Sequence, residues 1–175
     1  GGDSGLTEEY LYSCLEKNNN ENIFLTGSSN SILNKNFIGN LKLPKGNKNV
    51  TIHNTDGIHI IRKGKAGTIT YLEKNSYVLN DDAYLLTLKN NHIKVDLEWL
   101  YYTQKELFLN FSTSSDNGTW SKTGFLEYAK IDIPSLSEQK KVKEIFKKLT
   151  EKRKKIELFN IFNIPCKEKN YGRYN

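Results

Sequence analysis

Two short segments of the chain carry side chains suited to contacting a polyanion. The first is the basic turn at residues 62–67, where Arg62, Lys63 and Lys65 are interspersed with glycine and alanine. Cationic side chains and glycine N–H groups both suit phosphate oxygens. A Walker loop has a different spacing, with four residues between its first Gly and Gly-Lys-Ser/Thr. The turn is therefore either a site for a nucleic-acid backbone or the solvated tip of a hairpin.

The second segment is the polar loop at residues 112–124. It is long for a connection, and long ordered loops often carry function. Its hydroxyl, amide, ammonium and indole groups can hydrogen-bond to base edges, bind phosphates or stack on bases. The candidate DNA-contacting residues of the loop are Ser114, Asn117, Thr119, Trp120 and Lys122. Trp120 has a second interpretation, as a packing residue that closes the loop over the core.

Patterns typical of catalysis are weak. The sequence around Ser4, Gly-Asp-Ser-Gly, resembles a serine-protease nucleophile loop, but a triad also needs a positioned His and Asp, and a flexible glycine loop is the favoured interpretation. Asp81 and Asp82 have no companion carboxylate at nuclease-like spacing, which favours a turn. We expect no catalytic residue, metal or cofactor. A hydrolase using Ser4 or the aspartate pair remains a minor alternative.

The bulk composition indicates a folded domain with an appended element. The chain has 175 residues, 37% of them hydrophobic, with ten Tyr, eight Phe and two Trp. No apolar run approaches the ~18–20 residues that span a bilayer, and nothing resembles a signal peptide, so we expect a cytoplasmic protein. Cys14 and Cys166 have no metal-ligand spacing, and two free thiols are favoured over a disulfide. The glycine-rich start leads us to expect that the native polypeptide continues upstream.

The positive charge is concentrated in a predicted helix at residues 135–163. Residues 138–157 contain nine basic and four acidic side chains and so carry +5 of the net +6. Ser135 and Glu138 have the spacing of a capping box. Apolar residues recur at heptad spacing, interrupted by Lys152, which predicts pairing with another helix. The predicted helix-pairing residues are Val142, Ile145, Leu149, Ile156 and Phe159.

The rest of the chain is expected to be rich in strands. Hydrophobic runs bounded by turn residues predict strands at 23–26, 57–62, 68–72, 77–79 and 83–88, and the second and third of these are expected to form a hairpin. Helical spacing with Asp96 as a cap predicts one helix over 96–108. A further short strand is predicted at 131–133, before Pro134.

Taken in order, these pieces resemble the target recognition domain of type I restriction–modification specificity subunits, and the equivalent domain of some type IIG restriction–methylation enzymes. Residues 131–139 carry most of the resemblance, with a hydrophobic segment, a proline and a helix headed by Glu138-Gln139. The other matching segments are residues 57–67, 80–84, 97–102 and 117–125.

The resemblance implies an α+β fold. We expect a mixed or antiparallel β-rich recognition domain with short helices at 1–134, a long spacer and dimerisation helix at 135–163, and a flexible tail at 164–175. Such a module reads one half of a split target in double-stranded DNA. Its helix pairs with that of a second copy of the domain, and catalysis belongs to partner methyltransferase and nuclease subunits or domains.

Several alternatives stay open. The chain could be a half-subunit or a fragment of a longer enzyme. It could also be a protein-interaction module whose basic helix docks an acidic partner without DNA. Because the globular part is nearly neutral, we expect weak DNA affinity that falls steeply with salt.

Overall fold

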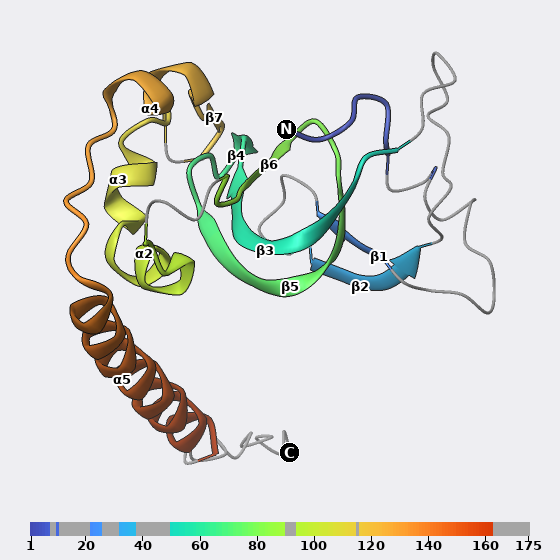
Figure 1. The fold of residues 1–175 in the computed structure, drawn as a ribbon. Helices are drawn as coiled ribbons and strands as arrows, with labels where there is room; N and C mark the ends of the chain where they lie inside the picture. Colours follow the sequence, from blue (N-terminus) through green and yellow to red (C-terminus); the bar gives the residue numbers. More distant parts are fainter. Residues whose placement is uncertain are drawn as a thin grey trace, which may run out of the picture.

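A computed structural model describes residues 1–7, 10, 22–25, 32–37, 50–89, 94–114 and 116–162. This part of the chain combines a curved sheet with helices packed against one side of it, and a long helix projects from the domain (Figure 1). The predicted α+β class is confirmed. The predicted tail at 164–175 and both cysteines lie outside the described residues.

The main sheet has five strands in the spatial order β2, β1, β5, β3, β6. β1 pairs parallel with β5, and the other neighbours are antiparallel, so the sheet is mixed. The predicted hairpin is confirmed, with Ile58 opposite Tyr71 and Ile60 opposite Ile69. The run at 77–79 is the end of β5, not a separate strand. The strands are β1 (Asn22–Leu25), β2 (Ile32–Phe37), β3 (Ile52–Ile61), β5 (Ile69–Leu79) and β6 (Ala83–Leu86).

β3 and β5 bend strongly along their length (Figure 1). Their register shifts between Thr55 and Gly57, and such a bulge bends a strand and increases its twist. The bend brings the two ends of β3 toward the same short turn. Ile52 at one end pairs with Val78, while Ile61 at the other pairs with Ala83, only five residues later in the chain. The sheet therefore curls toward a barrel-like shape around residues 79–83.

The main core lies between the sheet and three short helices, α2 (Leu97–Thr103), α3 (Lys105–Leu109) and α4 (Lys122–Tyr128). The fully buried Phe108 lies within it, with its ring centroid 4.7 Å from that of Phe125. Burying large aromatic side chains supplies much of the packing energy of a small domain. Aromatic packing thus ties the helices and the 112–124 loop to the sheet.

The single helix predicted over 96–108 is wrong, because the helix breaks at Gln104. The Thr103 hydroxyl donates to the Trp99 carbonyl at 2.9 Å, and a threonine that bonds back in this way bends a helix. The predicted cap is confirmed, since the Asp96 carboxylate accepts from the N–H groups of Glu98 and Trp99.

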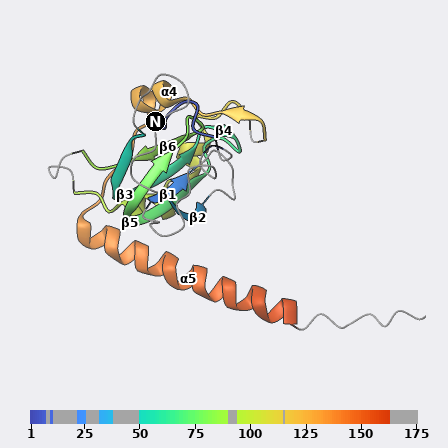
Figure 2. The same ribbon diagram turned by 90° about the vertical axis from the view of Figure 1, so that its right-hand side faces the viewer.

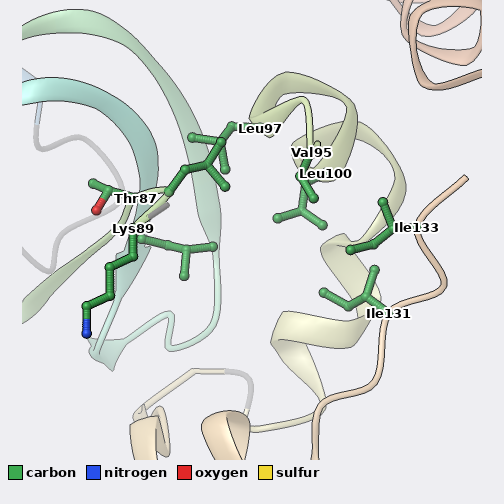
Figure 3. A pocket seen from close by; sticks show the side chains of 9 residues that line it. Thr87, Lys89, Val95, Leu97, Leu100, Ile131 and Ile133 are labelled. Carbon is green, nitrogen blue, oxygen red and sulfur yellow. The ribbon is translucent and has the colours of Figure 1, made fainter. Parts of the chain in front are cut away.

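The strand predicted at 131–133 is also wrong, because these residues form an extended connector without strand pairing among the described residues. Side-chain packing holds the connector in place. Ile131 packs against the main core, and together with Ile133 it lies beside an apolar groove of about 320 Å³ (Figure 3). The end of β6 and the α2 residues Leu97 and Leu100 line the other sides of this groove.

The connector leads into α5 (Leu136–Phe162), which extends away from the domain (Figure 2). The predicted capping box is confirmed. The Ser135 N–H donates to Glu138 Oε2 at 2.9 Å, and the Glu138 N–H donates to Ser135 Oγ at 3.4 Å. At about 1.5 Å per residue the helix is roughly 40 Å long. Within the described part of the chain, no helix has both the length and the hydrophobicity to cross a membrane.

The turn between β3 and β5 offers a matched pair of glycines that tests this packing. Gly64 and Gly67 both have positive φ, 83° and 81°. A Cβ at Gly64 would meet open space, whereas one at Gly67 would lie 2.9 Å from the Phe108 carbonyl oxygen. We expect Gly64→Ala to lower the free energy of unfolding by about 1–2 kcal/mol and Gly67→Ala by about 3 kcal/mol. Urea denaturation followed by tryptophan fluorescence measures both. Equal losses would contradict the close approach of the turn to α3.

Candidate nucleic-acid interface

The two segments singled out by the sequence lie side by side. The basic turn contains the short strand β4 (Lys63–Gly64), and the polar loop contains β7 (Gly118–Thr119). The two strands pair antiparallel, with Lys63 opposite Thr119. The Trp120 N–H extends the contact by donating to the Arg62 carbonyl at 2.7 Å. Segments more than fifty residues apart in the chain thus lie side by side (Figure 1).

The turn after β5 joins this surface as a third segment. The Arg62 N–H donates to the Asp82 carbonyl and its guanidinium to the Asp81 carbonyl, both at 2.8 Å. The Asn80 side chain accepts from the Asp82 N–H at 3.2 Å, as in an Asx turn. We call the three segments together, residues 62–67, 80–82, 114 and 116–122, the basic edge.

The basic side chains of the basic edge differ in their ion pairs and hydrogen bonds. Lys63 forms an ion pair with Asp82 at 2.9 Å, and the pKa of Lys63 is raised, chiefly by this hydrogen bond. Arg62 is half-buried, bonded to the aspartate turn, and lies 6.0 Å from the Tyr84 ring centroid. Lys65 and Lys122 are exposed and make no ion pair among the described residues. These two are the lysines of the edge whose charge is not already matched.

Backbone amides of the basic turn are used inside the turn itself. The Ala66 N–H donates to the Gly64 carbonyl at 2.8 Å, and the Gly67 N–H donates to the Ile61 carbonyl at 2.9 Å. The expectation that glycine amides of this turn suit a phosphate is therefore not supported at Gly67.

Trp120 is a core residue, which corrects its assignment as a base-stacking side chain. It is only 4% exposed, and its indole N–H donates to the Phe108 carbonyl at 2.9 Å. Its ring packs against Phe125 at 5.0 Å and Tyr84 at 5.6 Å between centroids. A base cannot stack on a face that other rings already cover. The packing interpretation of Trp120 is the one the geometry supports, and the residue anchors the loop.

The other candidate residues of the loop are exposed. Two hydrogen bonds between Thr113 and Thr119 close the loop. The Thr119 N–H donates to Thr113 Oγ1 at 3.0 Å, and the Thr113 N–H donates to the Thr119 carbonyl at 3.2 Å. Ser121 caps α4 by accepting from the Gly124 N–H at 3.0 Å. These anchors hold a short polar tip in front of the core. The exposed candidates are Ser114, Asn117, Thr119 and Lys122.

The two weak catalytic patterns have structural explanations. Asp3, next to Ser4, accepts from the Thr51 N–H at 2.7 Å and pairs with Asn80 as an isolated bridge, so the first residues close the curled sheet. Asp82 acts as the counter-ion of Lys63. Among the described residues, no cluster of three His, Cys, Asp or Glu side chains is arranged to hold a metal ion.

A buried glutamine joins α5 to the domain. Gln139 is fully buried, and its side-chain amide donates to the carbonyls of Lys94 at 2.9 Å and Pro134 at 2.8 Å. Its carbonyl oxygen accepts from the Asp96 N–H at 2.7 Å. A buried amide with all three partners in place holds one orientation, because a loss of any bond leaves a buried polar group unsatisfied.

Ion pairs with α2 continue this junction along the next turns of α5. Lys143 lies 2.5 Å from Asp96 and 3.5 Å from Glu98, and Lys147 lies 3.0 Å from Glu98. The hydrogen bond to Asp96 raises the pKa of Lys143. Burial alone would raise the pKa of Asp96, but Lys143 and the N–H groups that Asp96 caps outweigh it and lower that pKa. Phe146 stacks on Tyr102 at 5.7 Å beside these pairs.

The predicted helix-pairing residues divide into two groups. Val142 is half-buried and packs against the main core, so the domain itself already uses this position. Ile145, Leu149 and Ile156 are 58%, 56% and 60% exposed. The side chain of Phe159 lies outside the described residues.

The residues that orient the helix were not predictable from the sequence. Gln139 stands in the segment that carries most of the resemblance, yet its burial has no local signal, because glutamine is common on helix surfaces. Asp96 was predicted only as a cap. Its pairing with Lys143, 47 residues away, depends on the tertiary fold.

Comparison with known proteins assigns the chain to a family. The family model described as "Type I restriction modification DNA specificity domain" matches residues 7–160, most of the chain. The chain belongs to this family. No curated protein matches it. As members of the family are DNA specificity domains, membership favours a DNA-recognition module over a protein-interaction module without DNA.

A solved structure gives independent support for the fold of this specificity domain. This chain is similar to the crystal structure of the S subunit of a type I restriction–modification system from M. genitalium, with a TM-score of 0.51 and 16% sequence identity. The match covers 90% of this chain and 37% of that subunit. The specificity domain thus spans just over a third of the length of the matched subunit.

The junction of the specificity domain can be tested at Gln139. We expect Gln139→Ala to lower the free energy of unfolding by about 2–4 kcal/mol, because three backbone groups at the partly buried junction lose their partner. Gln139→Glu keeps the side-chain volume but removes both N–H donors, so it separates hydrogen bonding from packing. The exposed neighbour Lys140→Ala is the control and should stay within about 0.5 kcal/mol. A Gln139→Glu variant as stable as the native protein in chemical denaturation would rule out the hydrogen-bonded role.

Proposed function

We propose that this chain is the sequence-reading module of a restriction–modification system and that it contacts one half of a split target in double-stranded DNA through the basic edge. The chain itself would be non-catalytic. Methylation and cleavage would belong to partner methyltransferase and nuclease subunits or domains.

The observation that carries the proposal is the pairing of β4 with β7. It brings a lysine-bearing turn and a polar loop into one exposed surface, in a member of a DNA specificity domain family. Such a surface combines the two contact types of specific DNA binding, phosphate contacts that position the protein and polar contacts that distinguish bases. The exposed Ser114, Asn117 and Thr119 supply the polar groups.

Charge on the basic edge supports selective contact over strong non-specific attraction. Lys63 is paired with Asp82, and Arg62 is bonded to the same turn. Lys65 and Lys122 are then the two candidates for direct phosphate contact. With few free cations, few counter-ions are released on binding, and the affinity of one domain for DNA stays low.

The long helix has a separate role in the proposal. The hydrogen bond from the buried Gln139 to the Pro134 carbonyl helps to set the direction in which α5 leaves the domain. We propose that α5 pairs with the helix of a second specificity domain. Its length of roughly 40 Å would then set the distance between two half-sites.

A comparison of DNA methylation with and without the gene tests the function as a whole. We expect methylation at one split motif to disappear from the host genome when the gene is deleted and to return on complementation. Long-read sequencing of methylated bases measures this. An unchanged set of methylated motifs in a host with active methyltransferase subunits would exclude the proposed role.

Direct DNA binding can be measured without knowledge of the target. We expect Lys65→Ala and Lys122→Ala each to weaken binding to a random-sequence duplex and to reduce the slope of log K against log salt by about 0.9, one phosphate contact apiece. Fluorescence anisotropy across a salt series measures both quantities. Lys74→Ala, which removes an exposed lysine in the middle of β5, is the matched control. If Lys74→Ala had the same effect as the other two, binding would depend on overall charge and not on the basic edge.

A change at Asp82 should act in the opposite direction. Asp82→Asn keeps the size of the side chain but removes the counter-ion of Lys63. The freed ammonium can then contact a phosphate, so we expect tighter binding to the same random duplex and a salt slope steeper by up to about 0.9. Weaker binding by a variant with unchanged thermal stability would indicate that Asp82 itself contacts the DNA.

A further inference from the structure

Beyond its junction with the domain, α5 has an exposed apolar face. Ile145, Leu149 and Ile156 are more than half exposed and recur at helical spacing on the side of α5 next to the face that docks on α2. We call these three residues the free stripe. Single exposed apolar residues scattered over a surface are normal, but exposed apolar side chains gathered along one helix face indicate an interaction surface.

One flank of the free stripe is uniformly basic. Lys141, Lys148 and Lys155 are exposed, recur every seven residues and form the lysine row along this flank. Lys152 lies within the stripe itself. Among the described residues none of these four lysines makes an ion pair. The lysines facing the domain differ, because Lys143 and Lys147 are paired with acidic residues of α2.

We infer that the free stripe binds a non-identical amphipathic helix that carries acidic residues opposite the lysine row. This inference rests on the proposed pairing of α5 with a second specificity domain and names the chemistry of that partner. The apolar residues bury against the partner's apolar seam, and the flanking charges select which helix is accepted.

An identical copy of α5 is a poor partner in either direction. A symmetric antiparallel pair places the same flank of both helices on the same side of the interface, so the lysine row would face the lysine row. In a parallel pair each flank faces the opposite flank of the partner helix, so Lys148 would face Arg153 of the other copy. Like charges across such an interface repel. In the parallel pair Glu157, which binds Arg153 at 2.9 Å, offsets part of this repulsion, whereas no ion pair among the described residues offsets the lysine row in the antiparallel pair.

A protein helix fits this face better than a DNA backbone does. Phosphates would match the lysine row, but they gain nothing from burying isoleucine and leucine between the lysines. The chain already contains a contact of the inferred kind. At the junction of α5 with α2, Asp96 and Glu98 bind lysines of α5 while Tyr102 stacks on Phe146.

Three fluorescein-labelled peptides with the sequence of residues 136–162 test the inference against the full chain. One has the native sequence, and one carries Lys141→Glu, Lys148→Glu and Lys155→Glu. The matched control carries Lys140→Glu, Lys147→Glu and Lys154→Glu, which gives the same composition and net charge on a different face. We expect the peptide with the acidic row to bind the chain at least about tenfold more tightly than the other two, by fluorescence anisotropy at low salt. Leu149→Asn in the chain should abolish this preference.

Other outcomes would overturn the inference. Equal binding of the two charge-reversed peptides would show attraction by net charge alone. Tight binding of the native peptide, or a stable dimer of the chain at low salt in analytical ultracentrifugation, would identify an identical copy as the partner. Loss of duplex binding by a chain with Lys141, Lys148 and Lys155 changed to Ala would assign the row to DNA. Failure of the proposed function has a separate signature, the absence of any effect of Lys65→Ala on duplex binding.

Discussion

The position of Trp120 is the constraint on which the rest of the basic edge depends. Its backbone N–H bonds to the Arg62 carbonyl, its indole N–H bonds to the Phe108 carbonyl, and its ring is packed among Phe125 and Tyr84. One residue therefore holds the polar loop to the basic turn on one side and to the helical core on the other. Because these contacts are buried, the exposed tip of the loop can vary in sequence without loss of the frame that presents it.

Asp96 has the corresponding role for the long helix. One carboxylate oxygen caps α2, the other binds Lys143, and the backbone N–H is accepted by Gln139. Asp96 thus contacts both the start of α2 and the start of α5. The direction of α5 relative to the core is therefore fixed by this residue as well as by the packed connector before the helix. A helix that sets the distance between two half-sites, as proposed for α5, needs a fixed direction, because a mobile junction would make that distance variable.

Local signals made part of this architecture predictable. The β3–β5 hairpin, the Asp96 cap and the capping box of α5 each depend on neighbouring residues, and all three are present. The pairing of β4 with β7 was not predictable, because each strand has two residues and their partners lie more than fifty positions apart. Trp120 could not be assigned by type, since an indole suits both a core and a base stack. The burial of Gln139 likewise follows from tertiary packing, whereas the break at Gln104 accompanies the local hydrogen bond from Thr103 to the Trp99 carbonyl.

The near-neutral charge of the domain and the long charged helix can be explained together. In the proposed DNA complex, the pairing of Lys63 with Asp82 and the bonding of Arg62 to the same turn would lower the affinity for DNA and would also reduce binding to non-target DNA. A weak half-site becomes useful once a second one is attached at a fixed distance. Rigid linkage of two modules raises the effective concentration of the second contact and can increase overall affinity by about 10²–10⁴ without any new contact to DNA. The proposed recognition of a split target then depends as much on the stiffness of the junction at Gln139 as on the residues that face the bases.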